Sequence, residues 1–393
     1  MKNGWQWKPL GEVCKTGSGG TPLKEKKEYY EGGTIPWLMS GEVSQGEVRE
    51  ATRFITQKGL DNSAARIFPK DTVLVAMYGA TAGQVGILRF EATTNQAVCG
   101  ILPNKQFIPE FLFFFLLSKK EELVAQATGN AQPNISQIKI KNTNVPILSL
   151  PEQQRIVGIL DEAFEGITTA KANAETNLQN ARAVFESYLQ SVLQSKKWKW
   201  KTFGELCDDV EYGSSAKSKA DSGVPVLRMG NIQEGRLNWK NLVYTDDKAE
   251  IKKYLLKHND VLFNRTNSPE LVGKTAIYKS EMPAIFAGYL IRIHRKEDLL
   301  DADYLTYFLN SKIAFDYGKT VVISSVNQAN INGSKLKCYP IPAPSLAEQK
   351  AIVAKLNDLS EETQRLTSIY ERKLAALDEL KKSLLHQAFS GAL

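Results

Sequence analysis

Two long stretches of this chain place apolar or small side chains four and three residues apart in turn, a pattern typical of helices that pair in a coiled coil. In the first stretch these positions are Ile156, Leu160, Ala163, Ile167, Ala170, Ala174, Asn177, Ala181, Val184 and Tyr188. In the second they are Ile352, Leu356, Leu359, Thr363, Leu366, Tyr370, Lys373, Leu377, Leu380 and Leu384. Each pattern covers about forty residues, which would span roughly 60 Å as a helix.

The two patterns differ in the size of their side chains. The middle of the first is mostly alanine and that of the second mostly leucine, and small side chains opposite large ones pack closely. We therefore predict that the two helices pack against each other, antiparallel, so that two equal halves close with pseudo-twofold symmetry. The alternative is that each helix packs only on its own domain.

The beginnings of these helices are repeated in the sequence. Residues 145–160 (VPILSLPEQQRIVGIL) and 341–356 (IPAPSLAEQKAIVAKL) share eight of sixteen positions at an offset of 196. A second repeat matches WQWKPLGEVC at 5–14 with WKWKTFGELC at 198–207. It aligns Cys14 with Cys207, which we interpret as equivalent buried positions rather than a reactive thiol pair. The chain therefore consists of one unit made twice.

Each copy begins with short β-rich runs separated by Gly and Pro, such as DTVLVAMYG before residue 80 and DVLFNRTN at 260–267. A short helix (109–120 or 302–312) and a polar turn (129–136 or 325–332) follow. The predicted fold is α+β, with two β-rich α/β domains separated by two long helices that form an antiparallel coiled coil. The boundaries we expect are 1–145 and 196–341 for the domains, and 146–195 and 342–393 for the helices.

Charge separates the domains from the helices. The chain carries a net charge of +7, with +4 on residues 1–145, −3 on 146–195, +6 on 196–341 and zero on 342–393. A polyanion would therefore meet the domains first. No apolar run is long enough to span a membrane, and the four cysteines lack metal-binding spacing, so we expect a protein of the reducing cytoplasm without a metal site.

Motifs for catalysis are missing or incomplete. The Gly-Lys-Thr at 273–275 ends like a phosphate-binding loop, but Ser268 stands where the loop's first glycine belongs. Three scattered histidines argue against a histidine-based site, and the acidic pairs at 208–209 and 246–247 are more typical of solvated loops. We predict no catalytic residue and no methyl-donor motif in this chain.

The domains do carry side chains suited to nucleic acid, because Arg, Asn and Gln read base edges while Lys and Thr hold phosphates. In the first domain the candidates are Lys24, Lys26, Lys27, Tyr78, Thr81 and Gln84. In the second they are Lys217, Lys219, Arg228, Asn231, Asn264, Arg265, Asn267 and Lys274. For the helix seam we expect Ile156, Leu160, Ile167, Ala174, Ala181, Tyr188, Ile352, Leu356, Leu366, Leu377 and Leu384.

This arrangement resembles the specificity subunits of type I restriction–modification enzymes. The resemblance covers the whole chain and rests on the duplicated helix beginnings VPILSLPEQQRIV and IPAPSLAEQKAIV, the domain starts at Trp5 and Trp198, and the Gln-x-Asn-Ile turns at 132–135 and 328–331. One departure is the Ile-Leu-Ser-Leu-Pro of the first helix beginning, where the family favours Ile-Pro and Pro-Pro pairs.

The resemblance implies that each domain is a target recognition domain for half of an asymmetric, bipartite site in double-stranded DNA. It implies that the coiled coil sets the spacing and docks two modification (methyltransferase) subunits, with restriction subunits added outside. Adenine-N6 methylation and ATP-dependent cleavage then belong to the partners, which would hold S-adenosylmethionine, ATP and Mg. The alternatives are a self-contained DNA methyltransferase or nuclease, and a coiled-coil scaffold that binds only protein.

Overall fold

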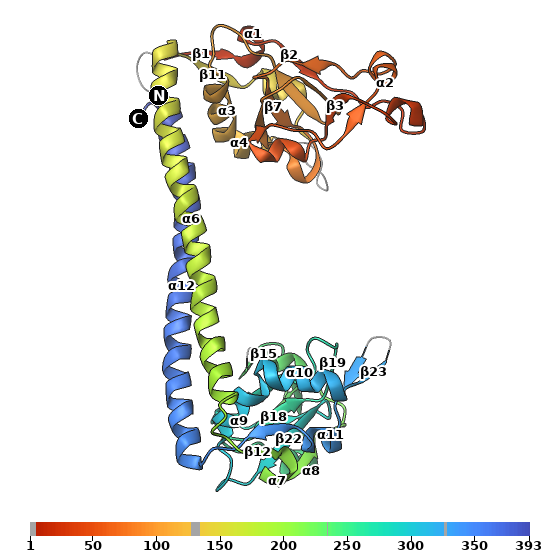
Figure 1. The fold of residues 1–393 in the computed structure, drawn as a ribbon, viewed down its shortest axis with the longest axis vertical. Coiled ribbons are helices and arrows are strands. Elements are labelled where there is room, and N and C mark those ends of the chain that lie inside the picture. Colours follow the sequence, from red (N-terminus) through yellow and green to blue (C-terminus); the bar gives the residue numbers. More distant parts are fainter. Residues whose placement is uncertain (1–4, 127–133, 234, 326–327) are drawn as a thin grey trace. The chain divides into compact units, whose positions relative to one another are not determined.

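The computed structural model describes residues 5–126, 134–233, 235–325 and 328–393 (Figure 1). The chain divides into two compact units. Unit 1 holds residues 1–175 and 372–393, and unit 2 holds residues 176–371. Each unit therefore contains one β-rich domain and part of both long helices, α6 (Leu150–Leu193) and α12 (Leu346–Ser390). No helix in the described ranges is both long and apolar enough to cross a membrane.

The domain of unit 1 is built on two sheets. The first has the order β2-β10-β7-β8-β4 and the second β5-β3-β9-β6. Strands β1 and β11 form a separate antiparallel pair beside the start of α6. The strands are β1 Gln6–Pro9, β2 Thr16–Ser18, β3 Ile35–Leu38, β4 Glu47–Val48, β5 Phe54–Ile55, β6 Ile67–Phe68, β7 Val73–Ala76, β8 Val85–Leu88, β9 Ala92–Thr94, β10 Val98–Ile101 and β11 Asn144–Ile147.

Unit 2 repeats this plan. Its main sheet has the order β13-β22-β18-β20, and a second sheet has the order β17-β14-β21. Smaller pairings are β12 with β25, β15 with β16, and β24 between β19 and β23. The strands are β12 Trp200–Thr202, β13 Cys207–Tyr212, β14 Val224–Leu227, β15 Ile232–Gln233, β16 Arg236–Leu237, β17 Val243–Thr245, β18 Val261–Asn264, β19 Thr266–Asn267, β20 Thr275–Ile277, β21 Ile285–Phe286, β22 Leu290–Arg295, β23 Ile323–Ser325, β24 Gln328–Asn330 and β25 Pro340–Pro342.

The pairing geometry confirms the internal repeat. Strands β2-β10-β7-β8 and β13-β22-β18-β20 are both antiparallel throughout, and each second sheet holds one parallel pair, β3 with β9 and β14 with β21. The predicted short helices are α3 (Pro109–Ser118) and α9 (Ala302–Leu309). The other helices are α1 Leu10–Val13, α2 Gln57–Asp61, α4 Lys120–Ala125, α5 Gln137–Lys141, α7 Phe203–Leu206, α8 Lys248–Tyr254, α10 Lys312–Val321 and α11 Gly333–Lys337.

The two long helices pack together and run antiparallel, which confirms the predicted fold class. In unit 1, Arg155 donates a hydrogen bond to the carbonyl of Leu393 at 3.2 Å, and Lys171 pairs with Asp378. In unit 2, the Thr363 hydroxyl donates to the carbonyl of Ala181 at 3.3 Å. Residue numbers rise along α6 while those of the contacting residues on α12 fall, as antiparallel pairing requires.

The helices also complete the core of each domain. In unit 1, Ile156 and Leu160 of α6 join Phe389 of α12 in one apolar cluster with α3 and the main sheet. In unit 2, Leu189 of α6 and Leu356 of α12 join α9 in the equivalent cluster. The predicted pairing is therefore confirmed, and the alternative that each helix packs only on its own domain is wrong, although both helices also contribute to the domain cores.

Four positions of the predicted seam are wrong, namely Asn177, Val184, Lys373 and Leu380. Side chains at these positions are exposed, with 54% of Val184 and 45% of Leu380 accessible to solvent. Neighbours one residue further along are less accessible. The physical reason is that a strict seven-residue repeat drifts by about 20° per heptad relative to a straight helix. Of the seam residues that we expected, the structure buries Ile156, Leu160, Ile167, Ala174, Ala181, Ile352 and Leu356, and half-buries Tyr188, Leu366, Leu377 and Leu384.

A buried glutamine ties the start of each long helix to its domain. Gln153 donates from its amide nitrogen to the carbonyls of Gln106 and Leu148, both at 2.9 Å, and its amide oxygen accepts from the Ile108 N–H at 2.9 Å. Gln349 donates to the carbonyls of Leu299 and Pro344 at 2.8 and 2.9 Å, and accepts from the Asp301 N–H at 2.8 Å. The repeated glutamine is therefore a structural joint between each long helix and its domain.

Candidate nucleic-acid interface

The same loop occurs in both domains at the end of the central strand of the main sheet. Loop A, residues 77–83, joins β7 to β8, and loop B, residues 265–273, leads from β18 to β20. Four main-chain hydrogen bonds hold each loop at equivalent places. All eight bonds run from a main-chain N–H to a main-chain carbonyl, over 2.8 to 3.1 Å. In loop A the donors and acceptors are Ala76 and Gln84, Gly83 and Ala76, Met77 and Ala97, and Ile135 and Met77. In loop B the corresponding pairs are Asn264 and Lys274, Gly273 and Asn264, Arg265 and Tyr289, and Ile331 and Arg265.

Each loop closes on a glycine with positive φ, +79° at Gly83 and +94° at Gly273, a region that other residues adopt with strain. A Cβ on Gly83 would also lie 2.9 Å from Val124 of α4. The polar turns contribute the fourth bond, through Ile135 and Ile331. The two loops thus share their support, while loop B is two residues longer and their sequences differ.

The structure gathers three candidates of the first domain at loop A. Tyr78 is exposed, whereas Thr81 and Gln84 are half-buried. Lys24, Lys26 and Lys27 are exposed on a different loop, where the Lys26 ammonium lies 5.3 Å from the ring centre of Tyr29. Residues 132 and 133 of the first Gln-x-Asn-Ile turn lie outside the described residues.

In the second domain, Asn264, Arg265 and Asn267 lie at loop B, and Lys274 follows it. Lys274 lines a cleft of about 850 Å³ that is also lined by Trp239 and Tyr307 within unit 2. The exposed Lys217, Lys219 and Arg228 lie elsewhere in the domain, where Lys219 pairs with Asp246 and Arg228 donates to the Asn241 carbonyl at 3.0 Å.

Burial argues against two candidates as DNA contacts. Asn231 is buried, its amide donates to the carbonyls of Asn238 and Lys240, and its side-chain oxygen accepts from the Arg228 N–H. Asn264 is fully buried; its amide nitrogen donates to the carbonyl of Leu271 inside loop B at 3.4 Å, and its side-chain oxygen has no hydrogen-bond partner among the described residues. Both side chains support loops, so we exclude them from the interface.

Sequence reasoning missed residues that adjoin loop B. Tyr212 of β13 lies beneath Arg265, with the guanidinium carbon 4.8 Å from its ring centre. Tyr289, which accepts the main-chain bond from Arg265, is exposed. Both are distant from loop B in sequence, and only the pairing of β13 with β22 and of β22 with β18 brings them there.

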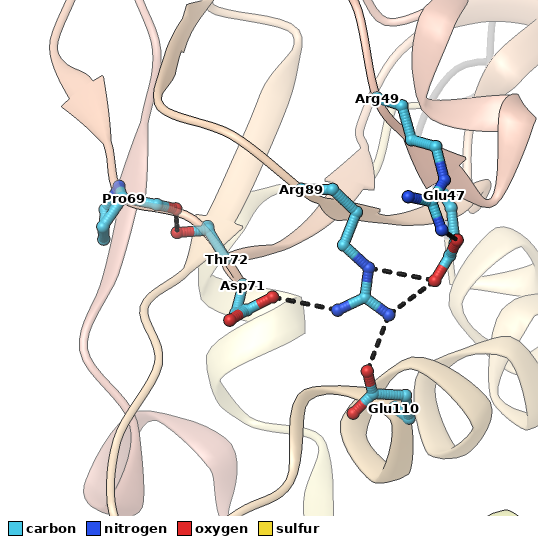
Figure 2. Close-up of polar contacts among 7 residues, drawn as sticks. All are labelled: Glu47, Arg49, Pro69, Asp71, Thr72, Arg89 and Glu110. Atoms are coloured by element: carbon cyan, nitrogen blue, oxygen red, sulfur yellow. Dashed lines mark hydrogen bonds and ion pairs between the residues drawn. The ribbon is translucent and has the colours of Figure 1, made fainter.

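A half-buried arginine, Arg89, lies at the end of the first domain's main sheet opposite loop A. Arg89 donates to Glu47 at 2.6 and 2.9 Å, to Asp71 at 2.9 Å and to Glu110 at 2.6 Å (Figure 2). Burial alone would lower the pKa of this guanidinium, but its hydrogen bonds to Glu110, Glu47 and Asp71 raise the pKa above its ordinary value. The carboxylates therefore serve as partners of Arg89. Lys279 with Asp303, 2.8 Å apart, is a simpler counterpart in unit 2.

The remaining acidic residues and cysteines noted in the sequence have structural roles. No group of three or more His, Cys, Asp or Glu able to hold a metal occurs within the described ranges. Asp209 pairs with Lys337 at 2.9 Å, and Asp247 caps α8. Burial raises the pKa of Cys14 to about 11 and that of Cys207 to about 12, which makes both thiols unreactive at neutral pH.

Comparison with known proteins identifies these two domains. The family model for the type I restriction modification DNA specificity domain matches twice, over residues 2–178 and 195–373. The chain is 24% identical over 420 residues to the type I restriction enzyme EcoKI specificity subunit of Escherichia coli K12, covering 100% of this chain and 90% of the relative. It is 25% identical over 419 residues to the StySPI specificity subunit of Salmonella potsdam, with the same coverage.

Solved structures have the same fold. A chain from a study of complex assembly and conformational transition of the type I R-M system matches with a TM-score of 0.78 at 20% identity, covering 100% of this chain and 99% of that one. The HsdS subunit from Thermoanaerobacter tengcongensis matches with a TM-score of 0.64 at 19% identity, covering 100% and 98%. The duplicated domains, the paired helices and the two family matches together show that this chain belongs to the type I restriction–modification specificity family, as a DNA specificity subunit that is not itself catalytic.

Proposed function

We propose that each recognition domain reads one half of an asymmetric, bipartite site in double-stranded DNA, with residues 1–145 and 196–341 as the two readers. The observation that carries this proposal is the pair of loops A and B, which share four main-chain supports but differ in length and in side chains. A fixed frame around variable side chains suits base reading, because base edges specify sequence while the frame only positions the reader. Because loops A and B differ in sequence, we expect the two half-sites to differ as well.

The long helices, residues 146–195 and 342–393, set the spacing between half-sites and dock two methyltransferase subunits. Val184 and Leu380 support two docking positions, since they occupy equivalent places in the repeat and are both exposed. In unit 2, Val184 lies with Ala183 and Tyr188 on an open face of α6. Exposed aliphatic side chains at repeated positions suit two copies of one partner.

Under this proposal, the partner subunits catalyse the reactions. Adenine methylation would use S-adenosylmethionine held by the methyltransferase subunits, and cleavage would use ATP and Mg held by restriction subunits. This chain recognises the target sequence and sets the spacing between its half-sites. The net charge of +10 on the two domains favours contact with the DNA backbone.

The first test replaces residues 78–82 of loop A with a Gly-Ser segment of equal length, in a complex with the methyltransferase subunits. We expect methylated adenines, mapped across a host genome, to lose sequence preference in one half-site only. The same replacement of residues 266–272 in loop B serves as the matched variant and should affect only the other half-site. Loss of preference in both half-sites from either replacement would contradict independent reading.

The second test shortens α6 and α12 by seven residues each, at repeat-equivalent positions. Seven residues of helix span about 10 Å, or about three base pairs of DNA. We expect a shorter unread spacer with both half-sites unchanged. An unchanged spacer length would show that the helices do not set the distance.

A further inference from the structure

Arg265 is held in place at the start of loop B. Its N–H donates to the Tyr289 carbonyl at 3.1 Å, and its carbonyl accepts from the Ile331 N–H at 2.9 Å, so its main chain is fixed on both sides. Its guanidinium lies against the ring of Tyr212, 4.8 Å from the ring centre. The Tyr212 hydroxyl in turn accepts a hydrogen bond from the Gly333 N–H at 2.8 Å. Backbone, side chain and supporting ring are therefore all positioned before any ligand arrives.

The guanidinium has no acceptor among the described residues. Its Nε atom is buried without a hydrogen-bond partner, and no carboxylate in the described ranges pairs with it. Other little-exposed arginines are matched, since Arg89 binds three carboxylates and Arg292 binds Glu211 and Asp260. The neighbours of Arg265 on loop B include the half-buried Asn267 and Ser268 and the exposed Glu270, which makes no ion pair with it. A half-buried charge without acceptor is costly, so its partner is expected from outside the chain.

The position is also specific to one of the two domains. Met77 occupies the equivalent place in loop A and is buried. Both domains need phosphate contacts to sit on DNA, and such contacts would be kept in both copies. An arginine present in one copy only is better suited to a base that one half-site has and the other lacks. The fork of Nη1 and Nη2 matches the O6 and N7 acceptors of guanine in the major groove.

We propose that Arg265, supported by Tyr212, reads a guanine in the half-site of the second domain. This inference rests on the proposed bipartite reading and adds the base and the residue that recognises it. The first domain, with Met77 at this place, reads its half-site through other side chains, of which Tyr78 is exposed on loop A.

The test uses the complete complex with its methyltransferase subunits and the target found by mapping methylated adenines. Each guanine of each half-site is replaced by 7-deazaguanine, which pairs normally but lacks the N7 acceptor. We expect one position, in one half-site, at which this replacement weakens binding by the wild-type complex about tenfold to a hundredfold. Binding by the Arg265→Ala complex should not respond to the same replacement, because the contact is already lost.

Arg265→Lys keeps the charge and loses the fork, so it should also lose the preference for guanine at that position. Arg365→Ala is the matched control for charge, since Arg365 lies on α12 paired with Glu362 at 2.6 Å, and it should leave the preference unchanged. Thermal unfolding of Arg265→Ala should show no loss of stability, because the variant removes an unmatched charge. A clear loss would assign Arg265 a structural role and overturn the inference.

Two binding outcomes also overturn it. If Arg265→Ala binds all sequences more weakly to the same extent, with a shallower salt dependence, Arg265 contacts a phosphate. If no guanine in either half-site responds to 7-deazaguanine in the wild-type complex, the base assignment is wrong while bipartite reading stands. If the complex methylates no bipartite site at all, the proposed function fails before Arg265 is tested.

Discussion

Gln153 and Gln349, 196 residues apart, make the same three hydrogen bonds at the starts of their helices. Each amide accepts from a main-chain N–H just before the domain's short helix, donates to a carbonyl two residues earlier, and donates to the carbonyl five residues before itself. Both side chains are fully buried. The helix therefore begins at a fixed place relative to its own domain, by a joint made of one side chain.

Replacing either glutamine by alanine should destabilise its unit strongly. The change leaves one N–H and two carbonyls without partners in a buried place, so we expect a loss of about 2–4 kcal/mol in the free energy of unfolding for Gln153→Ala and for Gln349→Ala. Urea unfolding measures this loss. The adjacent exposed residues give the controls Gln154→Ala and Lys350→Ala, for which a change of less than about 0.5 kcal/mol is expected. Equal effects of control and joint variants would contradict the assignment.

Charging the exposed aliphatic positions of the long helices should weaken assembly without unfolding the chain. Val184→Glu and Leu380→Glu place a carboxylate where a partner's apolar surface would lie, while in the free chain these side chains already face water. We expect each single variant to lose one methyltransferase subunit and the double variant to lose both, as measured by native mass spectrometry. Ala354→Glu, also on an exposed face of α12, should retain both subunits. Retention of two subunits by the double variant would exclude these positions from the docking surface.

Asp161 should make unit 1 less stable as pH rises. Although its side chain is largely exposed, its pKa is raised above the ordinary 3.8 by partial desolvation and by the neighbouring Glu110 and Glu47, against a smaller lowering by Arg89. A carboxyl whose pKa is higher in the folded state loses stability as pH climbs from its unfolded pKa through its folded pKa, and the loss is complete above the latter. Asp161→Asn should therefore raise the melting temperature by about 1–2 °C at pH 7.

The benefit of Asp161→Asn should disappear below about pH 3.8, where the carboxyl is neutral in both states. Calorimetry at several pH values measures the trend. Glu162→Gln, next to it on α6 and exposed, is the matched control and should change the melting temperature little at any pH. A benefit of Asp161→Asn that grows toward acidic pH would refute the repulsion by Glu110 and Glu47.

A single thiol should react in the native chain. Burial raises the pKa of Cys14 to about 11, and those of Cys99 and Cys207 to about 12, while Cys338 is exposed. An aromatic disulfide reagent at pH 8 should therefore titrate one equivalent without denaturant and four equivalents in guanidinium. Cys338→Ser should remove the native equivalent. Rapid reaction of a second native thiol would contradict the buried positions of the equivalent Cys14 and Cys207.

Much of the architecture could be predicted from the sequence because the sequence contains an internal repeat of the whole unit. The repeated helix beginnings and domain starts indicated the two domains and the paired helices. Seam positions such as Val184 and Leu380 were wrong, because a strict heptad drifts by about 20° every seven residues relative to a straight helix. Their exposure supplied the argument for docking, which the sequence pattern alone could not distinguish from a buried seam.

Single contact residues were harder to predict than elements. Asn231 and Asn264 have the right chemistry for base reading, but their amides are used inside the domain. The support of Arg265 by Tyr212 joins residues 53 positions apart, through two strand pairings that sequence patterns did not specify. Residue types in the sequence therefore pointed to loop B, but they could not show which of its side chains lack hydrogen-bond partners within the domain.

The main-chain frame of loops A and B has a consequence for how such a chain can change. Because the four supporting bonds use backbone atoms, substitutions between Ala76 and Gln84, or between Asn264 and Lys274, leave the bonds intact if the closing glycine stays. The two extra residues of loop B show that even length can vary within the same frame. If loops A and B read the DNA as proposed, a new target sequence can arise by a few mutations in one loop, with the main-chain frame of the domain kept.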